Sequence, residues 1–397
     1  MRTVFQNVRL VRAVSGEVPF EYADVAIEGN RITAVEPTGK LPAKPGDALV
    51  NGTGKTLLPG LYDIHQHSDA MSVNFLDNWK IRDPFDLVNK SCLWSMRMMK
   101  MGYTTMRCMG ARDYLGVRVR NVINAGVFNG PRLLASGNGI NGTMANQLSD
   151  NPAYDGADAW LHGAREQIAK GVDFLKIFVS GSVMSTMGHP GQLIVTPEEV
   201  QAAVKGGLVR GVYTAAHAHS AESIKVCLDA GVRTIEHATW CTPELRKQVK
   251  DNNDQQFLVP TLAVQQWCAE IAQTNNPELL YLAERARMVI DSCKESIGSA
   301  YAEGLIMGWG TDLDVESLEK EPGQEFRLRH EWCGMSPIEM IKQATMYSAQ
   351  ILELGDISGQ IKVGYEADLV LYEGKPDEDI SVFNQYPIVY KRGKLVE

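Results

Sequence analysis

Eight short apolar runs, each followed by a longer stretch with helical patterning, constrain the fold of this chain more than any other feature. Strands that alternate with helices favour βαβ units and a parallel sheet. Eight such units fit a closed (β/α)₈ barrel, although periodicity alone equally allows an open doubly wound sheet. The predicted strands lie near Leu57–Ile64, Thr104–Met109, Arg132–Ser136, Phe174–Val179, Val212–His217, Thr234–His237, Phe257–Thr261 and Leu305–Asp312.

The two ends of the chain carry short alternating β patterns instead, separated by turn residues such as Gly29 and Asn30. These strands are predicted at Thr3–Phe5, Asp24–Ile27, Ile32–Val35, Ala367–Tyr372 and Ile388–Lys394. We therefore predict an α/β protein with a (β/α)₈ TIM barrel over residues 57–356. Residues 1–56 and 357–397 are expected to build one small β-sandwich together.

Composition excludes several classes of partner. The 397 residues are 44% hydrophobic and 22% charged, which is typical of globular proteins. The net charge of −9 is spread along the chain without a basic run, so nucleic acid and membrane surfaces are poor candidate partners. No apolar stretch reaches the roughly 18 residues that a membrane-spanning helix needs.

Cysteine usage and the first residues indicate a cytoplasmic protein. The seven cysteines are scattered without a CxxC pair or the dense spacing of a disulfide framework, so we interpret them as buried thiols. The N-terminal residues lack the basic start and continuous apolar core of a signal peptide. We also expect a homo-oligomer.

Two histidines follow the first predicted barrel strand. His65 and His67 are two residues apart and therefore face the same way, as two ligands of one metal ion would. Alone, this pattern is a weak signal, because two such histidines are more often ordinary surface or core residues.

Lys176 lies inside the apolar run Phe174–Val179, which would bury an ammonium group. One interpretation is a lysine on a polar face whose stem reaches solvent. The other is a neutral amine that adds carbon dioxide and becomes a carbamate, whose two oxygens can bridge two metal ions.

Three further residues close predicted strands in the same way. His217 and His237 end consecutive strands, and Asp312 ends the last one, where a carboxylate can bind metal and exchange protons with water. Because barrel enzymes carry their active sites at the carboxyl ends of the strands, we expect all of these side chains to converge.

Together these motifs resemble the amidohydrolase superfamily. The resemblance rests on Leu58–His67, Gly130–Arg132, Lys176, His217–His219, Ile235–His237, Gly310–Asp312 and Gly364–Val370, and it covers nearly the whole chain. The chain is most similar to the imidazolonepropionase-like branch that contains Xaa-Pro (prolidase-like) dipeptidases and ochratoxin-type amidases.

The resemblance implies a binuclear hydrolase that cleaves an amide C–N bond by attack of a metal-bridging hydroxide. His65, His67 and Asp312 would hold one divalent ion, expected to be Zn²⁺, and His217 and His237 the other, with carboxylated Lys176 as the bridge. Asp312 would also be catalytic, by moving a proton from water to the leaving nitrogen. His219 would donate to the oxyanion and contact substrate, or would merely pack beside the site.

The substrate is expected to be a dipeptide, an N-acyl amino acid or a related small amide. The family's Gly-Gly-His carboxylate-binding element is replaced by Asn141–Gln147, so recognition of a carboxylate does not follow from the resemblance. His189 and Asn146 are the other candidates for substrate contact. The acidic segment Leu313–Glu321 is interpreted as a solvated loop or as an attractant for a cationic substrate.

The alternatives are a mononuclear deaminase or cyclic amide hydrolase of the same superfamily, and a non-catalytic metal-binding scaffold. A deaminase would need an acid three residues beyond His217, where this chain has Ser220. A complete set of six ligands argues against a scaffold.

Overall fold

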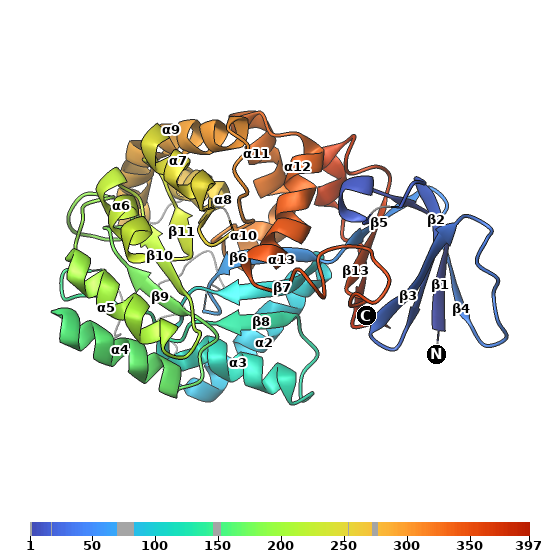
Figure 1. The fold of residues 1–397 in the computed structure, drawn as a ribbon, viewed down its shortest axis with the longest axis horizontal. Helices are drawn as coiled ribbons and strands as arrows, with labels where there is room; N and C mark the ends of the chain where they lie inside the picture. The colour runs from blue at the N-terminus through green and yellow to red at the C-terminus, as the bar shows by residue number, and fades with distance from the viewer. Residues whose placement is uncertain (1, 17, 70–82, 146–151, 253, 272–276) are drawn as a thin grey trace.

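The computed structural model describes residues 2–16, 18–69, 83–145, 152–252, 254–271 and 277–397. Figure 1 shows two parts: a ring of strands surrounded by helices, and a sheet in which strands from both ends of the chain lie side by side. None of the described helices is both long enough and apolar enough to cross a bilayer.

Two parallel sheets form the inner layer of the larger part. One has the order β6 (Leu61–Gln66), β7 (Tyr103–Cys108), β8 (Arg132–Ala135), and the other has the order β12 (Phe257–Val259), β11 (Thr234–His237), β10 (Thr214–Ala218), β9 (Leu175–Phe178). Seven of the eight predicted strands are therefore confirmed in parallel register.

The prediction of an eighth strand is wrong, because the segment Leu305–Asp312 makes only a single β-bridge, between Met307 and Leu258. Gly308 N–H donates to Leu258 and the Trp309 carbonyl accepts from Ile64, but Trp309 N–H donates to the Ser348 hydroxyl in place of a strand partner. On the other side, the bridge between Ile140 and Ile177 joins the segment after β8 to β9. Backbone hydrogen bonds thus link the two sheets on both sides.

Helices cover the outside of this ring (Figure 1). Six of the twelve described α-helices begin at side-chain caps. The Thr196–Glu199 capping box at the start of α5 satisfies two backbone N–H groups. The helices are α2 (Pro84–Lys100), α3 (Leu115–Asn124), α4 (Ala157–Ala169), α5 (Pro197–Leu208), α6 (Ala221–Ala230), α7 (Pro243–Asp251), α8 (Leu262–Glu270), α9 (Leu280–Ala302), α10 (Val315–Lys320), α11 (Gln324–Cys333), α12 (Pro337–Lys342) and α13 (Ser348–Ile351).

The predicted contribution of both termini to one β unit is confirmed by the strand pairing. Described strands from both ends form one eight-stranded sheet: β1 (Arg2–Leu10), β2 (Tyr22–Glu28), β3 (Arg31–Pro37), β4 (Ala48–Asn51), β5 (Lys55–Pro59), β13 (Leu369–Glu373), β14 (Ile388–Lys391) and β15 (Lys394–Leu395). The sheet folds over a shared core, because the rings of Phe5 on β1 and Tyr390 on β14 lie 4.9 Å apart although β5 and β13 stand between these strands. The predicted β-sandwich stays a prediction.

The predicted strand Leu57–Ile64 is divided at Gly60. Before Gly60 the chain is β5 and pairs with β13 in the terminal sheet; after it the chain is β6 and pairs with β7. A Cβ at Gly60 would lie 2.0 Å from the Thr104 hydroxyl oxygen, so only glycine fits at this change of partner.

Side chains that alternate along β13 face two different cores, and this strand thereby joins the terminal sheet to the larger part. Leu369 and Leu371 face the core of the terminal sheet, whereas Val370 and Tyr372 belong to the main core around the ring. The seven cysteines are free thiols; six are buried, as predicted, and Cys333 is partly exposed.

Candidate metal centre and active site

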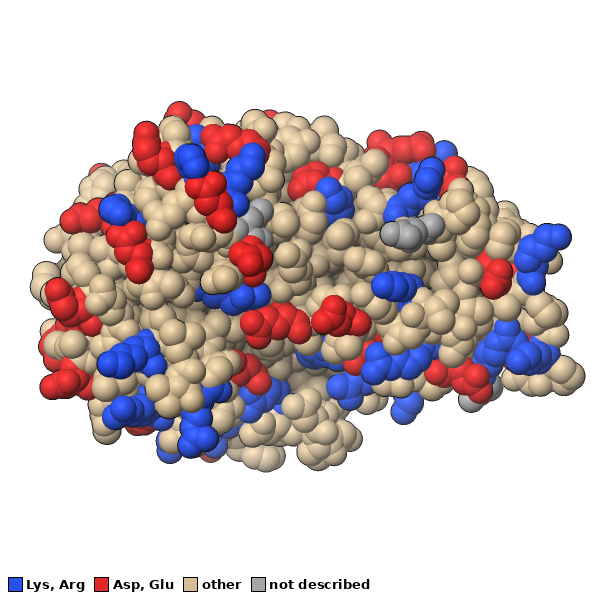
Figure 2. All heavy atoms as spheres, viewed as in Figure 1, with Lys and Arg blue, Asp and Glu red and all other residues tan. Residues whose placement is uncertain are grey.

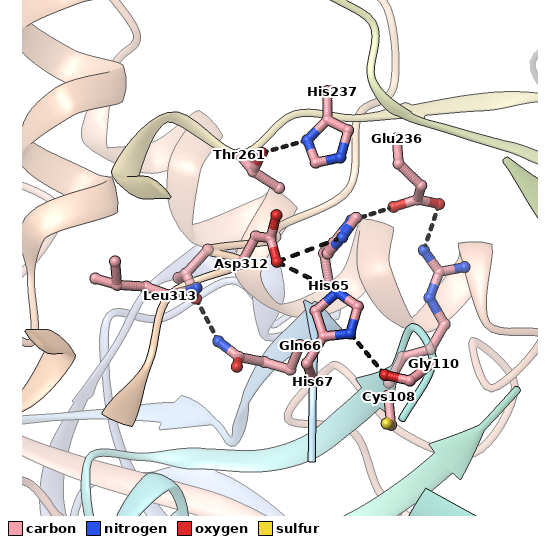
Figure 3. A network of polar contacts seen from close by, with 12 residues as sticks. His65, Gln66, His67, Cys108, Gly110, Glu236, His237, Thr261, Asp312 and Leu313 are labelled. Carbon is pink, nitrogen blue, oxygen red and sulfur yellow. Dashed lines mark hydrogen bonds and ion pairs between the residues drawn. The ribbon is translucent and has the colours of Figure 1, made fainter. Parts of the chain in front are cut away.

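His65, His67 and Asp312 form the first of two clusters of potential metal ligands, with one ligand atom of each within 4.8 Å of the others. The Asp312 Oδ1 lies 3.7 Å from His65 Nε2 and 3.4 Å from His67 Nε2. Figure 3 shows these three side chains pointing toward one another from β6 and the segment after Trp309. The predicted convergence of these residues is therefore observed.

His217, His219 and His237 form the second cluster, again with ligand atoms within 4.8 Å. The ring centroids of His217 and His237 are 4.6 Å apart, and those of His219 and His237 are 4.9 Å apart. The His219 ring is therefore about as close to the His237 ring as the His217 ring is. His219 is itself one of the potential ligands of this cluster.

Backbone conformation helps to aim two of these side chains. His237 and Asp312 have φ angles of 69° and 54°, in the left-handed region that residues other than glycine seldom adopt. Such strain is retained where the surrounding structure fixes it, as at functional sites. The backbone thereby turns at each of these two residues, at the end of β11 for His237 and after the segment through Trp309 for Asp312.

Each imidazole has one ring nitrogen in a polar contact, which leaves the other for a metal. His65 Nδ1 donates to Glu236 at 2.8 Å, and His67 Nδ1 donates to the Gly110 carbonyl at 2.6 Å. The Nδ1 atoms of His237 and His219 contact the hydroxyls of Thr261 and Thr239 at 2.7 and 2.6 Å. His217 uses Nε2, 3.5 Å from the Gly181 carbonyl.

Burial favours the neutral form of four of these histidines, His65, His217, His219 and His237. It lowers the pKa of His65, lowers those of His217 and His237 well below the ordinary value of 6.5, and lowers that of His219 to about 3. A neutral imidazole has a lone pair, so the set of donors fits divalent metal ions such as Zn²⁺.

Lys176 is 1% exposed, which excludes the interpretation that its amine reaches solvent. It lies on β9 opposite Ala215 of β10, with Nζ 4.9 Å from the centroid of the Phe178 ring. Burial lowers its pKa to about 8 from 10.5. Its charge in turn helps to lower the pKa of His65 and His237, one histidine from each cluster. The Phe178 ring beside its amine lies 5.8 Å from the ring of His217.

The substrate-contact candidates are less well placed. His189 is exposed on the hairpin that follows β9; its Nδ1 contacts the Pro190 carbonyl, and its ring centroid is 6.1 Å from that of Trp240. The Trp240 ring is also 6.4 Å from that of His219. Asn146 lies outside the described residues.

The acidic segment after Asp312 is not the expected solvated loop, because residues 315–320 form α10. Asp314 is buried and caps this helix by accepting from Ser317 N–H. Glu319 and Glu321 form ion pairs with Arg97 and Arg327. These acids therefore stabilise local structure.

Comparison with known proteins agrees with this geometry. The pattern of the family described as "Amidohydrolase family" matches residues 56–396. The chain belongs to this family. Membership implies a TIM barrel with an additional domain, in agreement with the parallel α/β ring and the terminal sheet.

Three similar proteins place this amidohydrolase among enzymes that act on C–N bonds. Ochratoxinase of Aspergillus niger is 27% identical over 378 residues, which cover 85% of this chain and 75% of the relative. A Xaa-Pro dipeptidase structure with bound methionine has a TM-score of 0.89 at 27% identity, covering 100% and 99% of the two chains. A prolidase structure with N-methylphosphonate-L-proline has a TM-score of 0.87 at 28% identity, covering 100% of both chains. The chain is a hydrolase of C–N bonds.

Sequence reasoning missed the groups behind the histidines. Arg107 and Glu236 form an ion pair at 2.8 Å, with both side chains fully buried, and Glu236 holds His65 (Figure 3). A signal was present, because each is a charged residue inside a predicted buried strand. Thr239 and Thr261 carried no signal, since threonine is common in and near strands.

Proposed function

We propose that this amidohydrolase cleaves the amide bond of a small substrate, such as a dipeptide or an N-acyl amino acid, at a two-metal centre in a closed eight-unit barrel. The observation that carries the proposal is the presence of two separate ligand clusters, with the buried Lys176 interacting electrostatically with histidines of both. A single catalytic ion needs about three protein ligands, whereas this arrangement offers two sets.

In this proposal His65, His67 and Asp312 would hold one metal ion, and His217 and His237 would hold the other. Lys176, carboxylated by carbon dioxide, would supply an anionic ligand shared by the two. The apolar surroundings of Lys176 disfavour its ammonium form, and a carbamate anion between two cations removes that cost. Zn²⁺ fits a set dominated by imidazole nitrogen.

The bound metals would supply a water of lowered pKa and a Lewis acid for the scissile carbonyl. Asp312 is the partly exposed member of the first cluster beside His65 and His67, and its carboxylate would serve as the group that accepts a proton at the site and returns it to the leaving nitrogen. His219, with Nδ1 held by Thr239, presents Nε2 for a hydrogen bond to the substrate oxygen as negative charge develops.

The small size of the substrate follows from the names of the relatives, which include ochratoxinase and two Xaa-Pro dipeptidases or prolidases.

The test is turnover of a panel by zinc-loaded enzyme: dipeptides including Xaa-Pro, N-acyl amino acids, lactones and cyclic amides. We expect release of an amine from at least one linear amide, with a Lys176→Ala variant as the inactive control. Ammonia release from a ring amine by enzyme carrying one metal ion would overturn the proposal and support the deaminase alternative.

A further inference from the structure

We propose that Glu236 and Arg107 are positioning residues that fix the orientation and tautomer of His65 and thereby set the affinity of its cluster for metal. This inference rests on the proposed metal function and deepens it. It assigns a role to a buried ion pair that neither binds a metal directly nor lies where a substrate could reach it.

The two oxygens of Glu236 have different partners. Oε2 lies 2.8 Å from His65 Nδ1, and Oε1 accepts from Arg107 at 2.8 Å and from the Thr234 hydroxyl at 2.6 Å. Because a carboxylate only accepts hydrogen bonds, His65 must carry its hydrogen on Nδ1. The lone pair is then on Nε2, the atom that faces Asp312.

Arg107 holds Glu236 and the backbone before His65 at once. Its Nε donates to the Ile64 carbonyl at 2.6 Å and its Nη1 to the Thr234 hydroxyl at 3.1 Å, while its guanidinium lies 5.2 Å from the centroid of the Phe174 ring. One side chain of β7 thus fixes the end of β6 against β11 inside the ring.

The ring nitrogen of His65 that points away from its cluster is hydrogen-bonded to a charged side chain, that of Glu236. The other histidines of the two clusters contact carbonyl or hydroxyl oxygens. A hydrogen bond to a carboxylate is stronger than one to a neutral oxygen and raises the basicity of the imidazole toward a metal. Loss of such a partner typically weakens metal binding about 10–100-fold.

Glu236 also lies at a point where the two clusters meet. It precedes His237 on β11 and is opposite His217 of β10 in the strand register, while its side chain holds His65 of the other cluster. Changing the side chain leaves the backbone positions of His217 and His237 in place. The effect on metal binding should therefore be confined to the first cluster.

Glu236→Gln is the sharpest variant, because it preserves shape. Its single amide oxygen can accept a hydrogen bond from His65 or from Arg107, but not from both. The NH₂ group then faces the remaining residue, and because both groups are donors no hydrogen bond forms there. Glu325→Gln is the matched control: Glu325 is 1% exposed and pairs with Arg329 at 2.7 Å, but its described contacts include none of the histidines.

The experiment titrates metal-free protein with Zn²⁺ alone and follows binding by calorimetry and elemental analysis. We expect two ions per chain for wild type and Glu325→Gln, and one binding step weakened about 10–100-fold in Glu236→Gln with the other unchanged. Unchanged affinities in Glu236→Gln, or equal weakening of both steps, would overturn the inference. Wild type that binds no zinc would instead refute the proposed function.

Nitrogen NMR of histidine-labelled, metal-free protein gives a second readout that general destabilisation does not move. We expect His65 as the pure Nδ1–H tautomer in wild type and in Glu325→Gln, and a mixture of tautomers in Glu236→Gln. Arg107→Lys, which keeps a positive charge beside Glu236, carries the same two tests if Glu236→Gln does not fold. A pure Nδ1–H tautomer in the variant would overturn the inference.

Discussion

The hydroxyl of Thr311 donates a hydrogen bond to the carboxylate of Asp63 at 2.6 Å, and this bond joins β6 to the segment that ends in Asp312. Asp63 also accepts from the Thr311 N–H at 3.2 Å and from the Gln66 amide at 2.8 Å. Because His65 and Asp312 lie directly beyond these contacts, Asp63 fixes the distance between two proposed ligands of one metal.

Thr311→Val should lower the free energy of unfolding by about 1–3 kcal/mol, because it leaves a fully buried carboxylate oxygen short of a donor. Urea unfolding of the metal-free protein measures this. Thr311→Ser keeps the hydroxyl and should stay within about 1 kcal/mol of wild type. If the valine variant were as stable as the serine variant, the bond would contribute nothing to the fold.

Lys176→Ala should fold but bind little metal and show little activity, because alanine offers neither a bridge nor a buried charge. Elemental analysis and turnover measure this. Short carboxylic acids in excess should restore part of the activity, since they fit the vacated space and offer two oxygens.

Lys176→Arg is the control for that rescue. Its guanidinium remains charged and fills the space, so added carboxylic acids should have no effect. Two metal ions and wild-type turnover in Lys176→Ala would exclude the bridging carbamate.

Metal content is a direct test of the two-cluster arrangement. Purified protein incubated with zinc and bicarbonate should contain about two divalent ions per chain, and dialysis against a chelator should remove both the metal and the activity. A ratio that stays at one after this incubation would contradict the binuclear assignment.

His219→Ala distinguishes a donor to the substrate from a metal ligand, because His219 lies among the potential ligands of the second cluster. We expect unchanged metal content and a kcat lowered about 10²–10³-fold, the usual cost of losing one oxyanion donor. Loss of one metal ion in this variant would make His219 a ligand.

The ion pair between Arg9 and Asp377 should make the stability of the protein depend on pH. Burial acts to raise the pKa of Asp377, but its hydrogen bonds and ion pair with Arg9 outweigh this and hold the pKa below 3.8. The stabilisation is therefore complete above pH 3.8 and is lost as the pH falls through the lowered pKa.

Asp377→Asn should cost about 1 kcal/mol at pH 7, since the pair is partly solvated. Urea unfolding of both proteins between pH 7 and pH 3 should show the difference shrinking only at the acid end. A difference that is constant over this range would mean that packing, and not charge, accounts for it.

The strand ends and the positions of the six proposed ligands could be predicted from sequence because apolar runs and polar residues at their ends mark parallel βα units. Leu305–Asp312 has the same apolar pattern, yet it is not a regular strand. Cβ atoms at Gly308 and Gly310 would lie 2.6 Å from atoms of Ile64 and His65, so this segment approaches β6 closely. One of its N–H groups bonds to Ser348, a distant residue that no local pattern reveals.

The residues that hydrogen-bond to the proposed ligands could not be predicted from local sequence patterns either. Glu236 and His65 are 171 residues apart, and only the closure of the ring brings them together. A charged residue in a buried strand indicates that a partner exists but not which one. The change of sheet at Gly60 has the same cause, because β5 and β6 form one continuous apolar run whose partners lie in different parts of the chain.

The pairing of β5 with β13 dictates the order in which a newly made molecule can be completed. Thr56 donates to the carbonyl of Gly374, which lies 318 residues later. At about 5–20 residues per second, the ribosome needs roughly 16–60 s to synthesise that interval. Until β13 emerges, β5 has an unpaired strand edge, the kind of edge that pairs with neighbouring chains. The interval before release from the ribosome is thus when this enzyme most needs protection from aggregation.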